Sequence, residues 1–414
     1  MADPNAPESY PTRWWTLLGY RDYRLLWVAL LGSSLVSWLR IFATSQWLLE
    51  ATGSPAIVGS IGVVQLIVQT PATLWGGTLA DRVDRKRLLV ASNATVCAVL
   101  FTLGLADAAG LLDTWLVFAG IAVSAAAQMF GSPARSALVP RVVPVSLLLP
   151  AASTDTATQN IAAVAAPLLF AAIVAVGGLS SMFLTAAVLA IPGVLLPAFV
   201  RASGRAEVDH GGVSTLSQTW DGLRYVARHP ILPGLFLLDT GITVASFYRE
   251  ILPVLALGLF AGGASATGML GAANSAGAIL GSFVALLLAG FRAKGMLVLY
   301  ASLAYGLFLF GFGLANSLWL GMVMIGLLGA ADAVTVAVRQ TTVMLTTPDH
   351  MRGRAFSIMV LSAQTANNIG TIWVGAWAAA IGAGETMVLG GVIAIVATLL
   401  AGWLFRPIRS FRSD

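Results

Sequence analysis

Six charged residues lie inside long apolar stretches of the sequence, where charge is rare. They are Arg40, Asp155, Asp239, Arg249, Glu250 and Asp332. If these stretches span a bilayer, each charge costs at least about 2.5–3.5 kcal/mol near its centre, so such residues usually have a function and face a polar interior. Burial disfavours the ionised form of a carboxyl group, so the acidic residues are candidates for taking up and releasing a proton. The arginines are candidates for ion pairs or for binding an anionic substrate.

Helical spacing groups these charges with polar side chains, because residues three or four apart share one face of a helix. Two polar stripes of this kind consist of Ser33, Ser37, Arg40 and Thr44, and of Asp239, Thr243, Ser246 and Glu250. A shorter stripe joins Asp332, Thr335 and Arg339. Further amides that could line a pathway are Gln65, Gln69, Gln128, Asn160 and Asn368. Each of these amides could equally join two helices.

Three carboxylates at staggered depths, on Asp239, Asp332 and Glu250, could form a path for protons. The hypothesis is that Glu250 or Asp332 carries the coupling proton. The alternative is a static set of ion pairs that holds parts of the protein together.

The composition places these residues in a membrane protein. Of the 414 residues 58% are hydrophobic and 10% are charged, with a mean hydropathy of +0.86, whereas a soluble domain carries about 25% charged residues. This excludes a soluble enzyme, a disordered chain and a nucleic-acid-binding domain. The sequence has no phosphate-binding loop, no catalytic triad and no metal-ligand spacing, so we expect no enzymatic activity, no ATP coupling and no metal or other cofactor. A single cysteine, Cys97, excludes an intrachain disulfide.

Twelve apolar runs are each about long enough to cross the bilayer as a helix, which takes about 20 residues. They cover residues 25–48, 56–80, 88–106, 115–133, 148–176, 180–200, 232–258, 265–290, 295–314, 317–341, 355–381 and 386–405. The predicted parts are an amphipathic N-terminal segment (1–24), a first bundle (25–200), a linker (201–231), a second bundle (232–405) and a tail (406–414). The expected fold class is therefore an all-α membrane protein with two six-helix bundles.

The basic residues predict the orientation. Twenty of the 23 Lys and Arg residues fall on the side of the N-terminus, and the loops on the other side hold none. Because cationic loops remain in the cytoplasm, we expect both termini and the linker to be cytoplasmic, in the inner membrane of a bacterium. The net charge of +5 then needs no nucleic-acid partner.

The two halves repeat weakly. The segment from Ser37 to Arg40 parallels Ser246 to Arg249 at an offset of 209, and Arg135 parallels Arg339 at an offset of 204. An internal duplication of six helices is typical of transporters, whose substrate site lies between the halves near the midplane.

A loop between the second and third runs combines glycine, aspartate and basic residues. Its key members are Gly77, Leu79, Asp81, Arg82, Arg85 and Lys86. Glycine allows helices to approach closely, and an aspartate at a helix end can accept from the free N–H groups of a neighbouring helix. We interpret the loop as a cytoplasmic gate whose charge network forms in one access state and breaks in the other. Simple anchoring by positive charge is the alternative.

This loop resembles the signature loop of the major facilitator superfamily. The segments 20–27, 131–135, 138–140 and 249–253 are similar to the efflux branch that contains macrolide exporters and the enterobactin exporter. The resemblance covers essentially the whole chain and implies twelve helices in two bundles, alternating access and proton-coupled export. Many drug–proton antiporters of the superfamily carry a buried arginine in the fourth helix, and the predicted fourth helix (115–133) has none.

The resulting functional hypothesis is a secondary active exporter of amphipathic drug-like or siderophore-like small molecules. It would work as a monomer in the lipid bilayer, with the proton gradient as its energy source. A lipid or lysophospholipid transporter or flippase, and an importer of nutrients or siderophores, fit the same fold. A membrane receptor without transport is a further alternative, which predicts ligand binding without flux.

Overall fold

The computed structural model describes residues 14–80, 83–204 and 215–412, and this part of the chain is helical, with no strand. The first half contains η1 (Trp14–Gly19), α1 (Arg21–Thr52), α2 (Pro55–Gly59), α3 (Ile61–Ala80), α4 (Arg85–Ala108), α5 (Thr114–Val142), η2 (Val145–Leu147) and α6 (Leu148–Ala198). The linker contains α7 (Thr215–Arg228). The second half contains α8 (Leu232–Ser246), α9 (Leu252–Phe260), α10 (Ala264–Leu287), η3 (Leu288–Gly290), α11 (Lys294–Gly313), α12 (Leu318–Thr346), α13 (Asp349–Ile381), α14 (Ala383–Leu404) and α15 (Arg406–Ser410).

The helices follow the apolar runs. Among the described residues, 8 helical segments are by themselves long and apolar enough to cross a membrane. Each of the twelve predicted runs coincides with helical structure, although α6 joins the fifth and sixth runs. Gly178 provides the turn inside α6 with φ 72°, a left-handed conformation that glycine adopts at little cost.

Side chains in the short loops define where helices begin. Asp84 Oδ1 accepts from the backbone N–H of Lys86 at 2.9 Å, at the start of α4. Asp113 Oδ1 accepts from the N–H of Leu116 at 2.7 Å, at the start of α5. These N-caps satisfy donors that the first helical turn leaves without partners, so the loops set the helix boundaries locally.

The seventh predicted span is broken. A continuous helix over 232–258 is wrong, because α8 ends at Ser246 and α9 begins at Leu252. Pro253, in the first turn of α9, has no N–H to donate and disfavours helical geometry at the residue before it. Arg249 and Glu250 therefore project from non-helical backbone and do not continue the polar stripe of α8.

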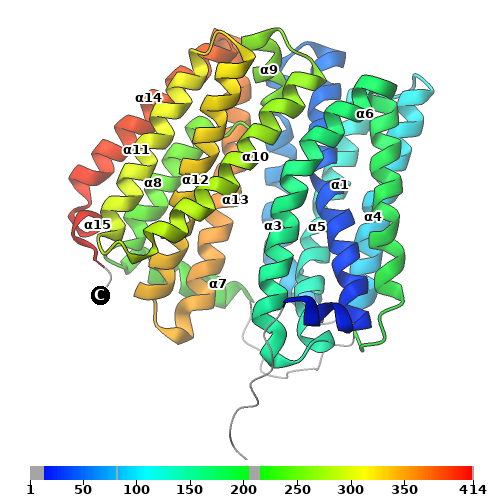
Figure 1. Cartoon of the computed structure of the whole chain (residues 1–414), viewed down its shortest axis with the longest axis horizontal. Coiled ribbons are helices and arrows are strands. Elements are labelled where there is room, and N and C mark those ends of the chain that lie inside the picture. Colours follow the sequence, from blue (N-terminus) through cyan, green and yellow to red (C-terminus); the bar gives the residue numbers. More distant parts are fainter. Residues whose placement is uncertain (1–13, 81–82, 205–214, 413–414) are drawn as a thin grey trace, which may run out of the picture.

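The helices form two bundles that separate in Figure 1 into a left and a right group. In the first half α1 and α4 pack against α6, and α5 packs against α3 and α4. In the second half α8, α10, α11, α12, α13 and α14 pack on one another. Contacts between the halves join α6 to α10 and join α2 and α3 to α13.

Close contacts between the halves lie at the end opposite η1 and α15, which is the upper end in Figure 1. A Cβ added to Gly59 would lie 2.8 Å from the Cα of Gly375, so α2 and α13 touch through their backbones. Thr267 Oγ1 donates to Gln46 Oε1 at 3.1 Å and joins α10 to α1. This end of the molecule is therefore closed by direct contact between the two halves.

Candidate functional site

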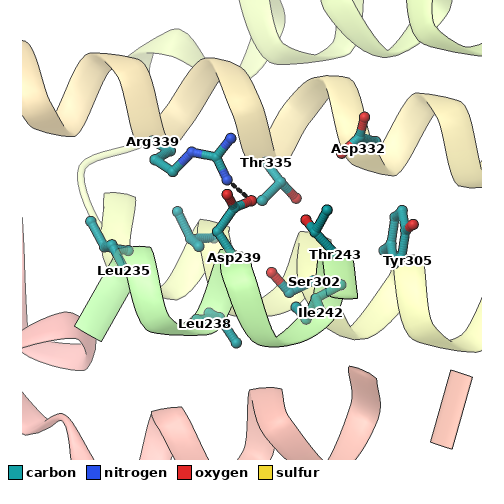
Figure 2. A pocket seen from close by; sticks show the side chains of 11 residues that line it. Leu235, Leu238, Asp239, Ile242, Thr243, Ser302, Tyr305, Asp332, Thr335 and Arg339 are labelled. Atoms are coloured by element: carbon teal, nitrogen blue, oxygen red, sulfur yellow. Dashed lines mark ion pairs between the residues drawn. The ribbon is translucent and has the colours of Figure 1, made fainter. Parts of the chain in front are cut away.

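A cavity of about 270 Å³ lies in the second half, on the side of α8, α12 and α13. Its polar and charged lining consists of Asp239, Thr243, Tyr248, Arg249, Tyr305, Asp332, Arg339, Gln340, Gln364 and Asn367. A smaller hollow adjoins it between α8, α11 and α12 (Figure 2). The predicted residues Asp239, Thr243, Arg249 and Asp332 thus meet at one site.

Asp239 and Arg339 form an ion pair across α8 and α12 (Figure 2). The side chain of Arg339 is 7% exposed and that of Asp239 is 18% exposed. A buried pair of this kind is costly to break by removing one partner, because the other charge is left uncompensated. The pair fixes α8 to α12 at one edge of the cavity.

Asp332 differs from Asp239 because it has no ion-pair partner within the described residues. It lines both the cavity and the smaller hollow. It lies seven residues before Arg339, which is roughly 10 Å along α12, and Figure 2 shows it on the far side of Thr335 from the ion pair. Asp332 is therefore a carboxyl group on the cavity wall that is not held in a salt bridge.

The two repeated motifs of the sequence meet where the halves face each other. The guanidinium of Arg249 lies 4.9 Å from the ring centre of Trp38 on α1 and 5.7 Å from that of Phe247. Glu250 is buried and its Oε2 accepts from Thr371 Oγ1 at 3.3 Å. Arg40 is also buried, and the carboxylate of Glu250 acts on it electrostatically. Trp38 and Arg40 thus face Arg249 and Glu250 across the interface.

Three of the predicted hydroxyls are engaged close to their own backbone. Ser37 Oγ donates to the carbonyl oxygen of Ser33 at 2.9 Å, and Thr44 Oγ1 donates to that of Arg40 at 2.8 Å. Ser246 is fully buried, and its Oγ lies 2.6 Å from the carbonyl oxygen of Ile242 and 2.9 Å from the hydroxyl of Tyr305. Of the hydroxyls of the two long stripes, Thr243 is the one that lines the cavity.

The predicted amides lie in different surroundings. Asn368 Nδ2 donates to Gln69 Oε1 at 3.2 Å, which joins α13 to α3 across the halves. Gln65 is buried, Gln128 is half-buried and Asn160 is exposed. None of these five amides lines the cavity of the second half.

The fourth helix extends beyond its predicted span and contains an arginine. The predicted boundary at residue 133 is wrong, because α5 continues to Val142 and includes Arg135. Arg135 pairs with Asp155 of α6 at 2.8 Å, and the hydroxyl of Tyr23 donates to Asp155 at 3.4 Å. Both side chains of the pair are 13% exposed. Arg135 and Arg339, which correspond at the offset of 204, therefore each pair with an aspartate of their own half.

The predicted gate is described in part. Gly77 lies on α3, whereas Asp81 and Arg82 lie outside the described residues. The backbone N–H of Arg85 donates to the carbonyl oxygen of Gly204 at 2.8 Å, and Lys86 Nζ donates to that of Val200 at 3.1 Å. The described part of this loop is thus bonded to the segment that follows α6, in its own half.

Several cavity residues were not predicted. Tyr248, Gln340, Gln364 and Asn367 lie on the wall, and Trp38 lies under Arg249. The spacing of Gln364 and Asn367 in an apolar run was a usable signal, since residues three apart share a helix face. Within the described residues no group of three or more His, Cys, Asp or Glu side chains could hold a metal ion.

Comparison with known proteins identifies the chain's relatives. The profile of the transmembrane secretion effector family matches residues 13–413. The enterobactin exporter EntS of Citrobacter koseri is 27% identical over 392 residues, which cover 93% of this chain and 90% of that protein. EntS of Escherichia coli is 28% identical over 355 residues, covering 84% of this chain and 81% of that protein.

Solved structures show the same fold at low sequence identity. A mutant of the nucleoside transporter NupG superposes with a TM-score of 0.74 at 14% identity, covering 94% of this chain and 99% of that one. A bacterial homologue of the lysosomal transporter Spinster gives a TM-score of 0.68 at 15% identity, covering 95% and 99%. The chain therefore belongs to the transmembrane secretion effector family of the major facilitator superfamily, and it is a multi-pass membrane transporter rather than an enzyme.

Proposed function

We propose that the protein is a proton-coupled exporter of amphipathic small molecules of the siderophore class, in the inner membrane of a bacterium. The observation that carries the proposal is the cavity on which Asp332 lies outside any described salt bridge, beside the paired Asp239 and Arg339. Similarity to enterobactin exporters over most of the chain supports the substrate class and the direction.

The cavity wall supports a substrate that has both hydroxyl groups and a flat apolar part. Gln340, Gln364 and Asn367 offer hydrogen-bond donors and acceptors. Arg249, already over the rings of Trp38 and Phe247, can also contact an aromatic substrate group. This combination suits a phenolic or catechol-like solute better than a sugar.

Asp332 is the proposed proton carrier because it faces the cavity, where it can exchange a proton with water. Asp239 is held by Arg339, and Glu250 is enclosed near Arg40 and Thr371. An ionised Asp332 can accept hydrogen bonds from substrate hydroxyls, whereas protonation removes much of this capacity. Proton binding would then weaken substrate binding, which is the relation that antiport requires.

The conformation fits one state of an alternating-access cycle. The halves touch at the end opposite the termini, through Gly59 and Gly375 and through Gln46 and Thr267. The basic loops favour a cytoplasmic position for the termini. The described state is then closed to the outside, and a monomer with the proton gradient as its energy source suffices for the cycle.

The direct test is flux through the purified protein in proteoliposomes. Radiolabelled siderophores, phenolic drugs and sugars are offered with and without an imposed pH gradient. We expect a siderophore or phenolic solute to move against the direction of proton flow, and the sugars not to move. Flux that ignores the gradient, or ligand binding without flux, would refute the proposal.

Lipid transport is the second candidate, and one observation favours it. An apolar pocket of about 1040 Å³ lies between η1, α1 and α6, with Trp15, Trp27, Leu149 and Ile161 on its wall. An acyl chain fits such a wall. A lipid substrate predicts transport that does not depend on the proton gradient and that detergent competes with, so the same vesicles separate the two functions.

A further inference from the structure

One face of the linker helix α7 packs against the rest of the protein. It packs against α13, α3 and α8, and it lies at the same end of the molecule as η1 and α15 (Figure 1). A Cβ added to Gly222 would lie 3.2 Å from atoms of Arg354 and Ile358, so this face of α7 is in close contact with α13. Tyr225 donates from its hydroxyl to the carbonyl oxygen of Thr346 at 3.4 Å. These contacts hold α7 across the ends of the membrane-spanning helices.

The other face of α7 is both apolar and basic. Trp220 is 67% exposed and Leu223 is 45% exposed, and they lie three residues apart on one edge. Arg224 and Arg228, four residues apart, form the adjoining edge and are also exposed. A large exposed tryptophan beside two arginines is the composition of a helix that lies in the plane of a membrane interface.

Both arginines line a depression on the basic edge of α7. It has a volume of about 570 Å³ and is lined by Asp221, Arg224, Tyr225, Arg228, His229 and Pro230. Asp221 Oδ2 lies 3.4 Å from Arg354 Nη1, so the charge of Asp221 is compensated by Arg354. Within the described residues neither Arg224 nor Arg228 has an ion-pair partner. The depression therefore carries uncompensated positive charge next to an apolar edge.

We propose that this depression binds the headgroup of an anionic phospholipid from the adjacent leaflet. The phosphate would contact the guanidinium groups of Arg224 and Arg228, which suit phosphate geometry. The acyl chains would lie along Trp220 and Leu223. Because α7 connects the two bundles and packs on α13, a bound lipid would hold the linker at the membrane surface. The inference does not depend on the identity of the transported solute.

The test is lipid binding by the purified full-length protein, measured by native mass spectrometry. The wild type, R224Q/R228Q and R406Q/R409Q are each titrated with phosphatidylglycerol and with phosphatidylcholine. The last variant is the matched control, since it removes two exposed arginines of α15 at the same end of the molecule. We expect R224Q/R228Q to bind phosphatidylglycerol about 30-fold more weakly than the wild type, with little change for phosphatidylcholine.

A second measurement places the lipid. Nanodiscs containing brominated phosphatidylglycerol should quench the fluorescence of Trp220, read as the difference between the wild type and W220F, and R224Q/R228Q should reduce that quenching. Equal phosphatidylglycerol affinity in the wild type and R224Q/R228Q would overturn the proposal. So would an equal loss in R406Q/R409Q, or quenching of Trp220 that the arginines do not affect.

Discussion

Asp239 and Arg339 show how a membrane-spanning bundle can contain full charges. Each residue compensates the other, and little of either side chain reaches solvent. Arg135, which corresponds to Arg339 at the offset of 204, pairs with Asp155 in the first half. Asp332 has no ion-pair partner in the described chain, and for this reason we propose it as the residue that changes its charge during transport.

Removing one member of the Asp239–Arg339 pair should destabilise the protein. D239N leaves the Arg339 guanidinium buried and uncompensated, so we expect a loss of about 3–5 kcal/mol in the free energy of unfolding. Equilibrium unfolding of the wild type and D239N in mixed detergent measures this change in the free energy of unfolding. D239N/R339Q should recover part of the loss because both charges are gone.

The control for this prediction is D349N. Asp349 also pairs with an arginine, Arg352, but its side chain is 88% exposed, so the change should cost at most about 1 kcal/mol. A cost for D239N as small as that for D349N would show that the buried pair does not stabilise the fold.

The sequence predicted which residues are charged in the membrane better than it predicted their partners. Asp239, Arg249 and Asp332 were found by their apolar surroundings, and all three line the cavity. Arg135 lies outside the predicted fourth span because the apolar run ends at Pro133, although α5 continues through that proline. Hydropathy detects the membrane-crossing part of a helix and not its polar extension.

At the scale of elements, the seventh span shows where helical periodicity fails. The stripe from Asp239 to Ser246 lies on α8 as the spacing predicted, but the break before α9 removes Glu250 from it. Pro253 was visible in the sequence, and its effect on the preceding backbone could have indicated the break. Discontinuous helices of this kind occur at the binding sites of many transporters.

The junction between α7 and α8 depends on a neutral histidine. His229 Nδ1 accepts from the backbone N–H groups of Ile231 and Leu232 at 3.2 and 3.3 Å. Burial lowers the pKa of His229 from its ordinary value of 6.5. A protonated imidazole has no acceptor, so acid should loosen this junction.

The pH dependence follows from that shift. The unfolded chain takes up a proton at His229 near pH 6.5, before the folded protein does, so stability is full above this pH and falls as the pH drops below it. Thermal unfolding between pH 5.5 and 7.5 should show this loss in the wild type. H229N, which keeps an acceptor that does not titrate, should reduce it, whereas H350N at an exposed position should behave like the wild type. An unchanged pH profile in H229N would contradict the assignment.

At the scale of the whole molecule, the two halves are separate bundles that touch most closely at one end. The twelve apolar runs were sufficient to predict where helical structure lies, apart from the break in the seventh span and the extension of the fourth. Hydropathy and charge indicate which segments cross the membrane, but they do not indicate how the two bundles pack against each other. The sequence pattern therefore could not predict which end of the molecule is closed. That information is in contacts such as Gly59 with Gly375, between residues far apart in sequence.

Forcing α2 and α13 apart at the contact between Gly59 and Gly375 should open the closed end of the molecule. G375A adds a methyl group against the backbone of α2, so it should shift the population toward a state open on the side opposite the termini. The probe is a cysteine introduced at Thr243 on the cavity wall, in a C97S background, labelled by an impermeant maleimide added from that side. We expect several-fold faster labelling in G375A.

The control for this measurement is G353A on the same helix, where an added Cβ meets nothing within 4 Å. It should label like the parent protein. If G375A and G353A label at the same rate, the contact between α2 and α13 does not close the molecule.

The central claim is that a proton on Asp332 is exchanged for substrate in the cavity of the second half. The most direct measurement compares two activities of D332N in proteoliposomes: accumulation of a labelled siderophore driven by a pH gradient, and exchange of the same solute at equal pH. We predict that D332N loses gradient-driven accumulation and retains exchange, while D349N retains both. Gradient-driven accumulation that remains intact in D332N would contradict the account, and E250Q/D332N then shows whether Glu250 carries the proton instead.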